Sequence, residues 1–193
     1  FGGGLRVSEP FHLFTADVQP HWDDSSRAFV AVHHPSLGYA PNNWKNHKHQ
    51  RGFRQEYLAA KFGLMPRHQI RGKLHAGWKH PALDDHWFMQ VHWFPEVYGV
   101  WFMQIWQRYL EQITSIERNH PYAWINIASK YCGGIYTIGR YEAALQRAVE
   151  RIGLVYGKRY GTTAHGGRHA YGQRARRGSI DPIIIQRIMH HCS

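Results

Sequence analysis

The chain has 193 residues, enough for one domain with a substantial core and marginal for two. Hydrophobic residues make up 43% and charged residues 19%, a composition that excludes an intrinsically disordered chain. Lysine and arginine number 24 against 13 acidic residues, a formal net charge of +11, and no apolar run approaches the ~18 residues of a membrane span. This excess favours a polyanionic partner, above all nucleic acid, with a solvated basic surface or anionic lipid as alternatives.

The first third of the chain predicts one helix, one strand and a long irregular segment. Residues 5–17 are typical of a helix start, with Pro10 in the first turn. Residues 27–32 have the apolar, β-branched composition of a strand. Residues 33–76 carry several prolines, glycines and basic residues, and they predict a surface-lying insertion with one short helix at 55–62.

The middle of the chain predicts a hairpin and a buried helix. Residues 73–79 and 87–92 are expected to pair as antiparallel strands. Residues 97–113 form an apolar helix whose wide hydrophobic surface indicates deep burial. Clustered aromatic side chains favour the core, and this is the expected place of Trp78, Trp87, Trp93, Trp101 and Trp106.

The last third has the clearest helical signals. After an extended piece at 121–126, apolar residues recur over 139–152 at helical spacing, and Gly153 is a suitable stop. A further helix is predicted over 162–176, and Asp181-Pro182 opens the last one. The expected fold is therefore mainly α with a small antiparallel β-sheet, an α+β class.

The residues of the 162–176 helix include a candidate phosphate site. His165 and Arg168 are three positions apart and share one helix face near the helix N-terminus. Amide groups there favour anions, an arginine fork binds phosphate, and Gly166 and Gly167 leave room for a ligand backbone. The alternative is a surface helix with incidental basic residues, because such short motifs occur by chance.

Neither histidines nor cysteines predict a metal site. His165 and His169 have the i, i+4 spacing of a ligand pair, but no zincin glutamate or third ligand accompanies them. Cys132 and Cys192 are too far apart in sequence to form a redox or metal motif, and they suggest a reducing, cytoplasmic compartment.

Four motifs in chain order resemble those of the tyrosine recombinase or phage integrase family. From His165 and Arg168 the sequence runs to an apolar helix and a turn that resembles the family's third box, with His191 at the histidine position and His190 in place of the usual glycine. Gly4–Glu9, here called the first box, resembles the family's Gly-x-Arg-x-x-Glu motif, and Asp17 matches the aspartate that follows it.

The fourth motif is the lysine that the family presents on a β-hairpin. Gly77-Trp78-Lys79 resembles this hairpin, with Lys73 as a rival to Lys79. The resemblance covers nearly the whole chain apart from the insertion at 33–76.

The resemblance implies the catalytic-domain fold of the DNA breaking-rejoining enzymes and a 3′-phosphotyrosyl intermediate. Arg6 and Arg168 would hold the scissile phosphate, Lys79 would act as general acid, His165 as general base and His191 as a further donor. No metal or nucleotide cofactor is implied. The implied partner is double-stranded DNA, bound by a homotetramer, with no membrane involved.

The family's nucleophilic tyrosine is expected shortly after the third-box histidine, and none of the eleven tyrosines occupies that place. We therefore expect residues 1–193 to be a single catalytic domain, truncated at both ends, that binds DNA without cleaving it. Further DNA contacts are expected in the insertion and in the basic loop after 153, at Lys45, Lys48, Arg51, Arg54, Lys158 and Arg159. A solvated protective loop is the alternative for the insertion.

Three other functions remain open. A catalytically silent DNA-binding module of the same fold would need positive charge but not the complete set of site residues. A type IB topoisomerase-like enzyme would share the same residue types and intermediate. A basic RNA-binding domain would need an aromatic RNA platform, and the sequence has no such motif.

Overall fold

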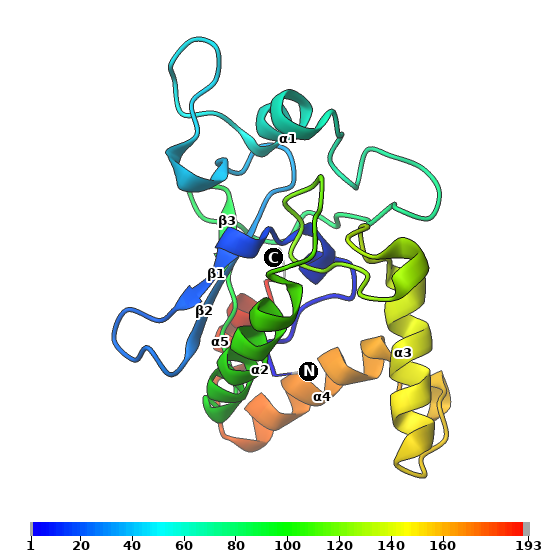
Figure 1. The fold of residues 1–193 in the computed structure, drawn as a ribbon. Helices are drawn as coiled ribbons and strands as arrows, with labels where there is room; N and C mark the ends of the chain where they lie inside the picture. The colour runs from blue at the N-terminus through cyan, green and yellow to red at the C-terminus, as the bar shows by residue number, and fades with distance from the viewer. Residues whose placement is uncertain (1, 191–193) are drawn as a thin grey trace.

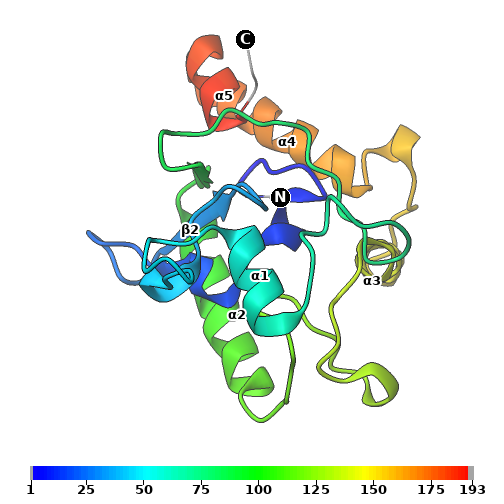
Figure 2. The ribbon, with the colours of Figure 1, turned by 90° about the horizontal axis from the view of Figure 1, so that it is seen from above.

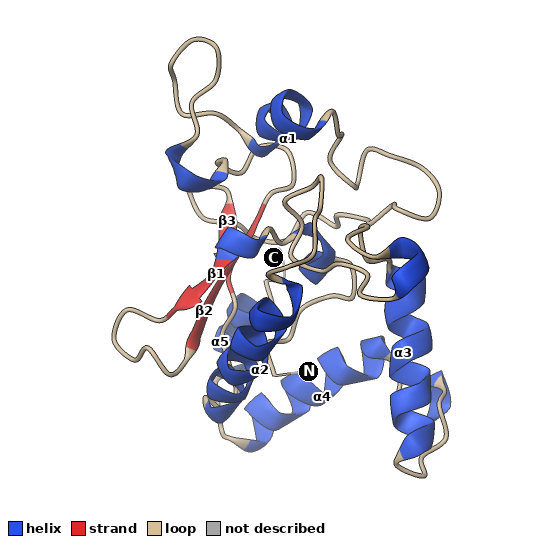
Figure 3. Cartoon of the chain, in the orientation of Figure 1, coloured by secondary structure: helices blue, strands red, loops and turns tan. Residues whose placement is uncertain are grey.

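A computed structural model describes residues 2–190 and is mainly helical around a small antiparallel sheet (Figure 1, Figure 3). Its α-helices are α1 (Arg54–Phe62), α2 (Val97–Ile113), α3 (Ile138–Arg151), α4 (Ala164–Arg177) and α5 (Pro182–Ile188). Its strands are β1 (Val18–Pro20), β2 (Ala28–His33) and β3 (Phe88–Gln90). Short 3-10 turns complete the described elements: η1 (Glu9–His12), η2 (Thr15–Asp17), η3 (Pro41–Asn43), η4 (Ser129–Tyr131) and η5 (Lys158–Tyr160). The expected α+β class is confirmed.

Strand β2 is the centre of the sheet and of the larger core. It pairs antiparallel with β1 and β3, with Val30 opposite Val18 and Val32 opposite Met89. Val30 and Val32 are both buried, and α2 packs against β2. A central strand covered in this way is apolar along its length, which explains why its composition identified it so well.

The predicted hairpin of residues 73–79 with 87–92 is wrong. Residues 73–79 form no strand, and β3 pairs instead with β2. Segment 34–87 is therefore the connection between two antiparallel neighbours, and it carries Lys79. β3 pairs with β2 because Val32 and Met89 are both buried when the two strands meet. Pairing β3 with the exposed, basic residues 73–79 would bury less apolar surface.

The N-terminal segment is not one helix, as its sequence predicted, but the two turns η1 and η2. Leu13, between them, is extended, and its carbonyl accepts a hydrogen bond from the Ala123 amide at 2.8 Å. Thr15 donates to the Pro121 carbonyl at 3.1 Å. Pairing with residues 121–123, which are extended as expected, replaces the hydrogen bonds that a continuous helix would have made.

Helix α2 has the predicted bounds but not the predicted deep burial. Trp106 is buried against the sheet, whereas Trp101 is 51% exposed and Ile105 66% exposed on the outer face. Of the other tryptophans expected in the core, Trp78 and Trp93 are partly buried and packed against it, and Trp87 is exposed. No helix among residues 2–190 is long and apolar enough to cross a membrane.

The last three helices follow their sequence signals closely. Gly153 has a left-handed φ of 78° just after α3, the Thr163 hydroxyl caps α4, and Asp181 caps α5 through the Ile183 amide at 2.7 Å. Viewed from above, α4 and α5 lie together on one side of the N-terminal segment, with α3 at the edge (Figure 2).

Segment 33–76 contributes to the core and is not only a surface insertion. Its short helix α1 was predicted, and Leu58 from this helix packs with Phe14 and Tyr122 in a second core cluster. Arg54 is 1% exposed, pairs with the buried Asp17 and lies 4.1 Å from the centre of the Phe14 ring. This ion pair fixes α1 to the N-terminal turns.

The buried pair gives a stability prediction. Arg54→Ala is expected to destabilise the protein by about 3–5 kcal/mol, because it leaves the Asp17 carboxylate buried without its partner. Arg51→Ala is the matched control: Arg51 is exposed over the Tyr39 ring, and its loss should cost about 0.5–1 kcal/mol. Urea unfolding measures both. Similar losses in the two variants would contradict the structural role of Arg54.

Candidate phosphate-binding site

The first box is held together by a single carboxylate. Glu9 is almost completely buried at the start of η1, and its Oε2 accepts a hydrogen bond from the Arg6 amide at 2.6 Å. Its Oε1 accepts from Arg6 Nη1 at 2.8 Å. A spacing of three residues lets one carboxylate bind both the backbone and the side chain of Arg6, so the Arg-x-x-Glu pattern orients this guanidinium.

Gly4 is the residue of the first box that contacts α4. Its φ is +65°, and a Cβ at this position would lie 2.7 Å from Cδ1 of Tyr171. Both the left-handed backbone and the close approach of the ring require glycine. Tyr171 is fully buried one turn after Arg168, and its hydroxyl donates to the His92 carbonyl at 2.8 Å.

Arg168 joins the first box to the end of α5. Its Nη1 donates to the Gly4 carbonyl, and its Nη2 donates to the Met189 carbonyl at 2.7 Å. Burial lowers the pKa of Arg168, while the nearby Glu9 carboxylate raises it. The Arg6 guanidinium also faces Arg168 closely enough for charge repulsion. Two arginine side chains from opposite ends of the chain are thus brought to one place.

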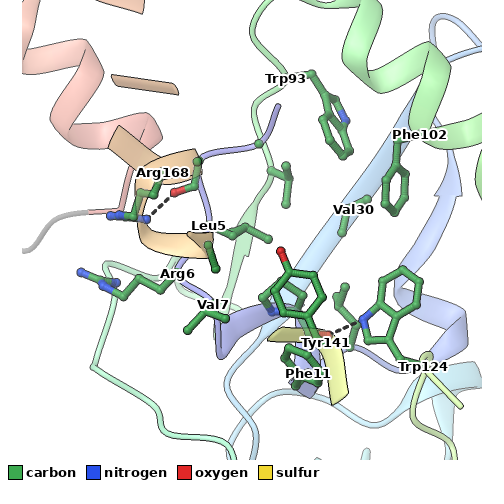
Figure 4. Close-up of a pocket in the computed structure, with 17 residues that line it drawn as sticks. Leu5, Arg6, Val7, Phe11, Val30, Trp93, Phe102, Trp124, Tyr141 and Arg168 are labelled. Carbon is green, nitrogen blue, oxygen red and sulfur yellow. Dashed lines mark hydrogen bonds between the residues drawn. The ribbon is translucent and has the colours of Figure 1, made fainter. Parts of the chain in front are cut away.

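An apolar cavity of about 200 Å³ lies behind these residues (Figure 4). Its wall includes Tyr141 from α3 and the rings of Phe11, Trp93, Phe102 and Trp124. Figure 4 shows the Arg6 and Arg168 side chains pointing away from these rings, on the same side as each other. Arg6 and Arg168 line the same cavity, with their guanidinium groups at its polar edge.

His165 is exposed in the first turn of α4, one turn before Arg168. Its Nε2 lies 2.8 Å from Nε2 of His169, so that one ring donates a hydrogen bond to the other. No group of three or more possible metal ligands occurs in the described part of the chain. The contact with His169 thus orients the ring of His165, which is exposed to solvent.

Gly166 of the His165–Arg168 motif has a different reason from the one expected. A Cβ on Gly166 would lie 1.9 Å from the Gly161 carbonyl oxygen, so its absence accommodates the protein's own loop. Gly167 is buried and lines the apolar cavity. Room for a ligand is not needed to explain Gly166.

The turn after α5 has the left-handed backbone that glycine favours, although a histidine stands there. His190, where the resembling motif has glycine, has a left-handed φ of 54°. Its ring is buried and lies 6.1 Å from that of His92, centre to centre. His191 lies outside the described residues.

Lys79 is exposed in the connection between β2 and β3. The neighbouring Gly77 carbonyl lies 3.3 Å from Nε2 of the buried His12, which belongs to η1. Trp78 packs edge-on against the same His12 ring, with ring centres 5.4 Å apart. These contacts attach the residues before Lys79 to the turn that directly follows the first box. Lys73, the rival lysine, is exposed beside the residues that precede α3.

Five of the six predicted DNA-contact residues are exposed: Lys45, Lys48, Arg51, Lys158 and Arg159. The sixth, Arg54, is buried against Asp17 and Phe14, so a DNA contact by Arg54 is incompatible with the structure. Its position beside other basic residues in the sequence gave no sign of this ion pair.

Sequence reasoning did not assign roles to three residues near the site. Glu9 orients Arg6, Tyr171 supports Gly4, and His190 packs beside His92. Glu9 was recognisable as part of the first-box pattern, but the Gly4–Tyr171 and His190–His92 contacts are between distant segments and leave no local signal.

Comparisons with known proteins bear on the fold. No family model matches the sequence, and no curated protein matches it. Among solved structures, XerA recombinase matches with a TM-score of 0.57 and 14% identity, over 100% of this chain and 46% of that one. The Tn1549 transposon integrase, solved in complex with transposon right end DNA, gives a TM-score of 0.49 and 19% identity, over 100% and 48%.

The match to XerA recombinase shows that this chain has a tyrosine recombinase-like fold. The expectation from the four motifs is confirmed at this level. The chain spans about half the length of the solved structures it matches.

The contact of Gly4 with Tyr171 gives a second prediction. Gly4→Ala is expected to destabilise the protein by about 2–4 kcal/mol, because it combines a left-handed alanine with a steric clash. Gly139→Ala is the control: Gly139 lies in α3 with nothing within 4 Å of the added Cβ, and this change should stabilise by about 0.5–1 kcal/mol. Equal effects in thermal or urea unfolding would refute the packing explanation.

Buried histidines give a third prediction, on pH. Burial lowers the pKa of His12 to about 3 and those of His120 and His190 to about 4. These rings are neutral in the folded state, whereas the unfolded chain takes up protons below about pH 6.5. Stability should therefore be full above this pH and decline toward pH 4, by at most about 1.4 kcal/mol per pH unit for each ring. Urea midpoints measured from pH 7.5 to 4.5 test this, and a flat profile would contradict it.

Proposed function

We propose that this chain carries the phosphate-activating site of a DNA recombinase that cuts and rejoins strands through a 3′-phosphotyrosyl intermediate. The observation that carries the proposal is the convergence of Arg6 and Arg168, from opposite ends of the chain, at one polar site. The fold shared with XerA recombinase and the net charge of +11 support it. Double-stranded DNA is the proposed partner, with a tetramer acting on it.

The two guanidinium groups suit a phosphate diester. Arg6 is oriented by Glu9 before any ligand arrives, and Arg168 is held by two main-chain carbonyls. Such preorganised positive charge stabilises the additional negative charge of a pentacoordinate transition state more than it stabilises the ground state. Arg6 and Arg168 would bind the non-bridging oxygens, and His191 would add a further hydrogen bond.

The proton-transfer roles go to two exposed residues. His165 would act as general base toward the attacking hydroxyl, with its ring oriented by His169. Lys79 would act as general acid and protonate the 5′-oxygen that leaves. Its exposed position in the β2–β3 connection allows it to approach DNA, and the contacts of Gly77 and Trp78 with His12 place the residues before it next to the first box.

The nucleophile is proposed to lie outside these 193 residues. Tyr171 is the tyrosine of α4 and follows Arg168 by one turn. It is fully buried, and its hydroxyl donates to the His92 carbonyl. Burial raises the pKa of Tyr171 to about 12, which disfavours the phenolate. On this proposal the chain alone binds duplex DNA and forms no covalent adduct.

The function is tested with the intact protein and a nicked duplex that traps the covalent adduct. Arg6→Gln should lower the rate of adduct formation about 10²–10³-fold, as expected for the loss of one preorganised donor. DNA affinity should change little, because one phosphate contact among many is lost. Arg177→Gln, an exposed arginine in the last turn of α4, is the control and should leave the rate unchanged. Equal rates for Arg6→Gln and the control would refute the assignment of Arg6.

A second arm of the same experiment separates the role of Lys79. A duplex with sulfur in place of the 5′-bridging oxygen gives a thiolate leaving group, which needs no general acid. Lys79→Ala should therefore cleave this duplex at nearly the wild-type rate and the normal duplex far more slowly. A similar loss on both duplexes would exclude Lys79 as the acid. Absence of cleavage by the wild-type protein, with DNA binding intact, would indicate a silent DNA-binding module.

A further inference from the structure

His190 stands in an unfavourable backbone conformation for its residue type. It follows α5 and its cap residue Met189, and its amide donates to the Arg187 carbonyl at 2.9 Å. Its left-handed φ of 54° costs a non-glycine residue about 1–2 kcal/mol, and glycine would avoid this cost. The turn itself therefore gives no reason for a histidine.

The ring of His190 is buried among positively charged and titratable groups. The residue is 7% exposed, and the main chain of Gln90 forms a hydrogen bond with its ring. The groups that face it are His92 from the segment after β3, Arg168 from α4 and Arg6 from the first box. Burial, with these neighbours, lowers its pKa to about 4, so the imidazole is neutral near pH 7.

The second ring nitrogen has no partner. Nε2 of His190 is shielded from water and makes no hydrogen bond within residues 2–190. An unpartnered buried nitrogen is unfavourable, so its presence calls for an explanation. Protonation would convert Nε2 into a donor, but beside two guanidinium groups it would add a third positive charge with only the Glu9 carboxylate to balance it.

A bound anion would reverse this balance. A phosphate at Arg6 and Arg168 brings negative charge next to the ring and offers an oxygen as acceptor, and both effects favour the protonated imidazole. By linkage, any ligand that favours protonation binds more tightly as the pH falls toward the pKa of the bound state.

We propose that His190 takes up a proton when a phosphate group binds at Arg6 and Arg168, and then donates its Nε2–H to a phosphate oxygen. The proton comes from solvent, stays on the imidazole while the anion is bound and returns to solvent on release, so no covalent bond changes. His190 is thus a phosphate-binding residue in addition to those assigned above. The identity of the natural ligand as a DNA phosphate rests on the proposed function, whereas the proton-linked anion site does not.

Inorganic sulfate is a suitable probe, because it remains a dianion from pH 4.5 to 8 and any pH dependence belongs to the protein. NMR of the labelled histidine rings gives the pKa of His190 with and without sulfate, and isothermal titration gives the affinity. We expect the pKa to rise from about 4 to about 6 or higher with sulfate bound. The affinity should increase at least tenfold from pH 7.5 to 5.

His190→Gly removes the ring and fits the left-handed backbone, so the variant is expected to fold. At pH 5 it should bind sulfate more weakly than the wild type, and it should lose most of the increase in affinity from pH 7.5 to 5. Ser179→Gly is the matched control, because Ser179 also has a left-handed φ, of 59°, and is exposed after α4. Ser179→Gly should remove the same unfavourable left-handed conformation of a non-glycine residue and keep the wild-type dependence of sulfate affinity on pH.

Three results would overturn the proposal. The first is that sulfate does not bind, or binds Arg6→Gln as tightly as the wild type. The second is that sulfate leaves the pKa of His190 unchanged, and the third is that His190→Gly keeps the wild-type dependence of affinity on pH. Failure of the proposed function looks different. In that case sulfate binds with protonation of His190, but the intact protein forms no DNA adduct. Conversely, normal adduct formation by His190→Gly would leave the function standing and remove His190 from it.

Discussion

The guanidinium of Arg168 connects three segments that are distant in sequence. It comes from α4 and donates hydrogen bonds to the Gly4 carbonyl in the first box and to the Met189 carbonyl at the end of α5. The carbonyls at a helix end have no partner within the helix, so an arginine is well suited to this position. Removing a guanidinium from water is costly, and these two acceptors offset much of the cost. The N-terminal segment, α4 and the turn after α5 therefore occupy fixed relative positions, and the guanidinium groups of Arg6 and Arg168 lie where they meet.

Each residue of the first box is explained by a contact. Glu9 holds both the amide and the guanidinium of Arg6, and Gly4 is required by its backbone and by the Tyr171 ring. The segment has little regular structure of its own, since it enters a short 3-10 turn only at Glu9. Its conformation is determined by α4 and by the buried carboxylate. This explains how a polar site can be preorganised on a segment that is neither a helix nor a strand.

Elements with strong local signals were predictable from sequence, and elements defined by distant pairing were not. Helices α2 and α4 were located by periodicity, caps and stops, and β2 by its composition. The partner of β3, the two turns in place of a first helix and the exposed face of α2 all depend on which distant segment packs against them. The same distinction holds for the site. The motifs indicated Arg6 and Arg168, but the burial of Arg54 and the position of His190 arise from tertiary contacts with Asp17 and His92.

The central claim is that Arg6 and Arg168 together bind one DNA phosphate. The most direct measurement is a crystal structure of the intact protein on a duplex. The account predicts a backbone phosphate with non-bridging oxygens within hydrogen-bond distance of both guanidinium groups, about 2.7–3.2 Å. A complex in which DNA follows another basic surface, and in which no phosphate reaches either arginine, would contradict it.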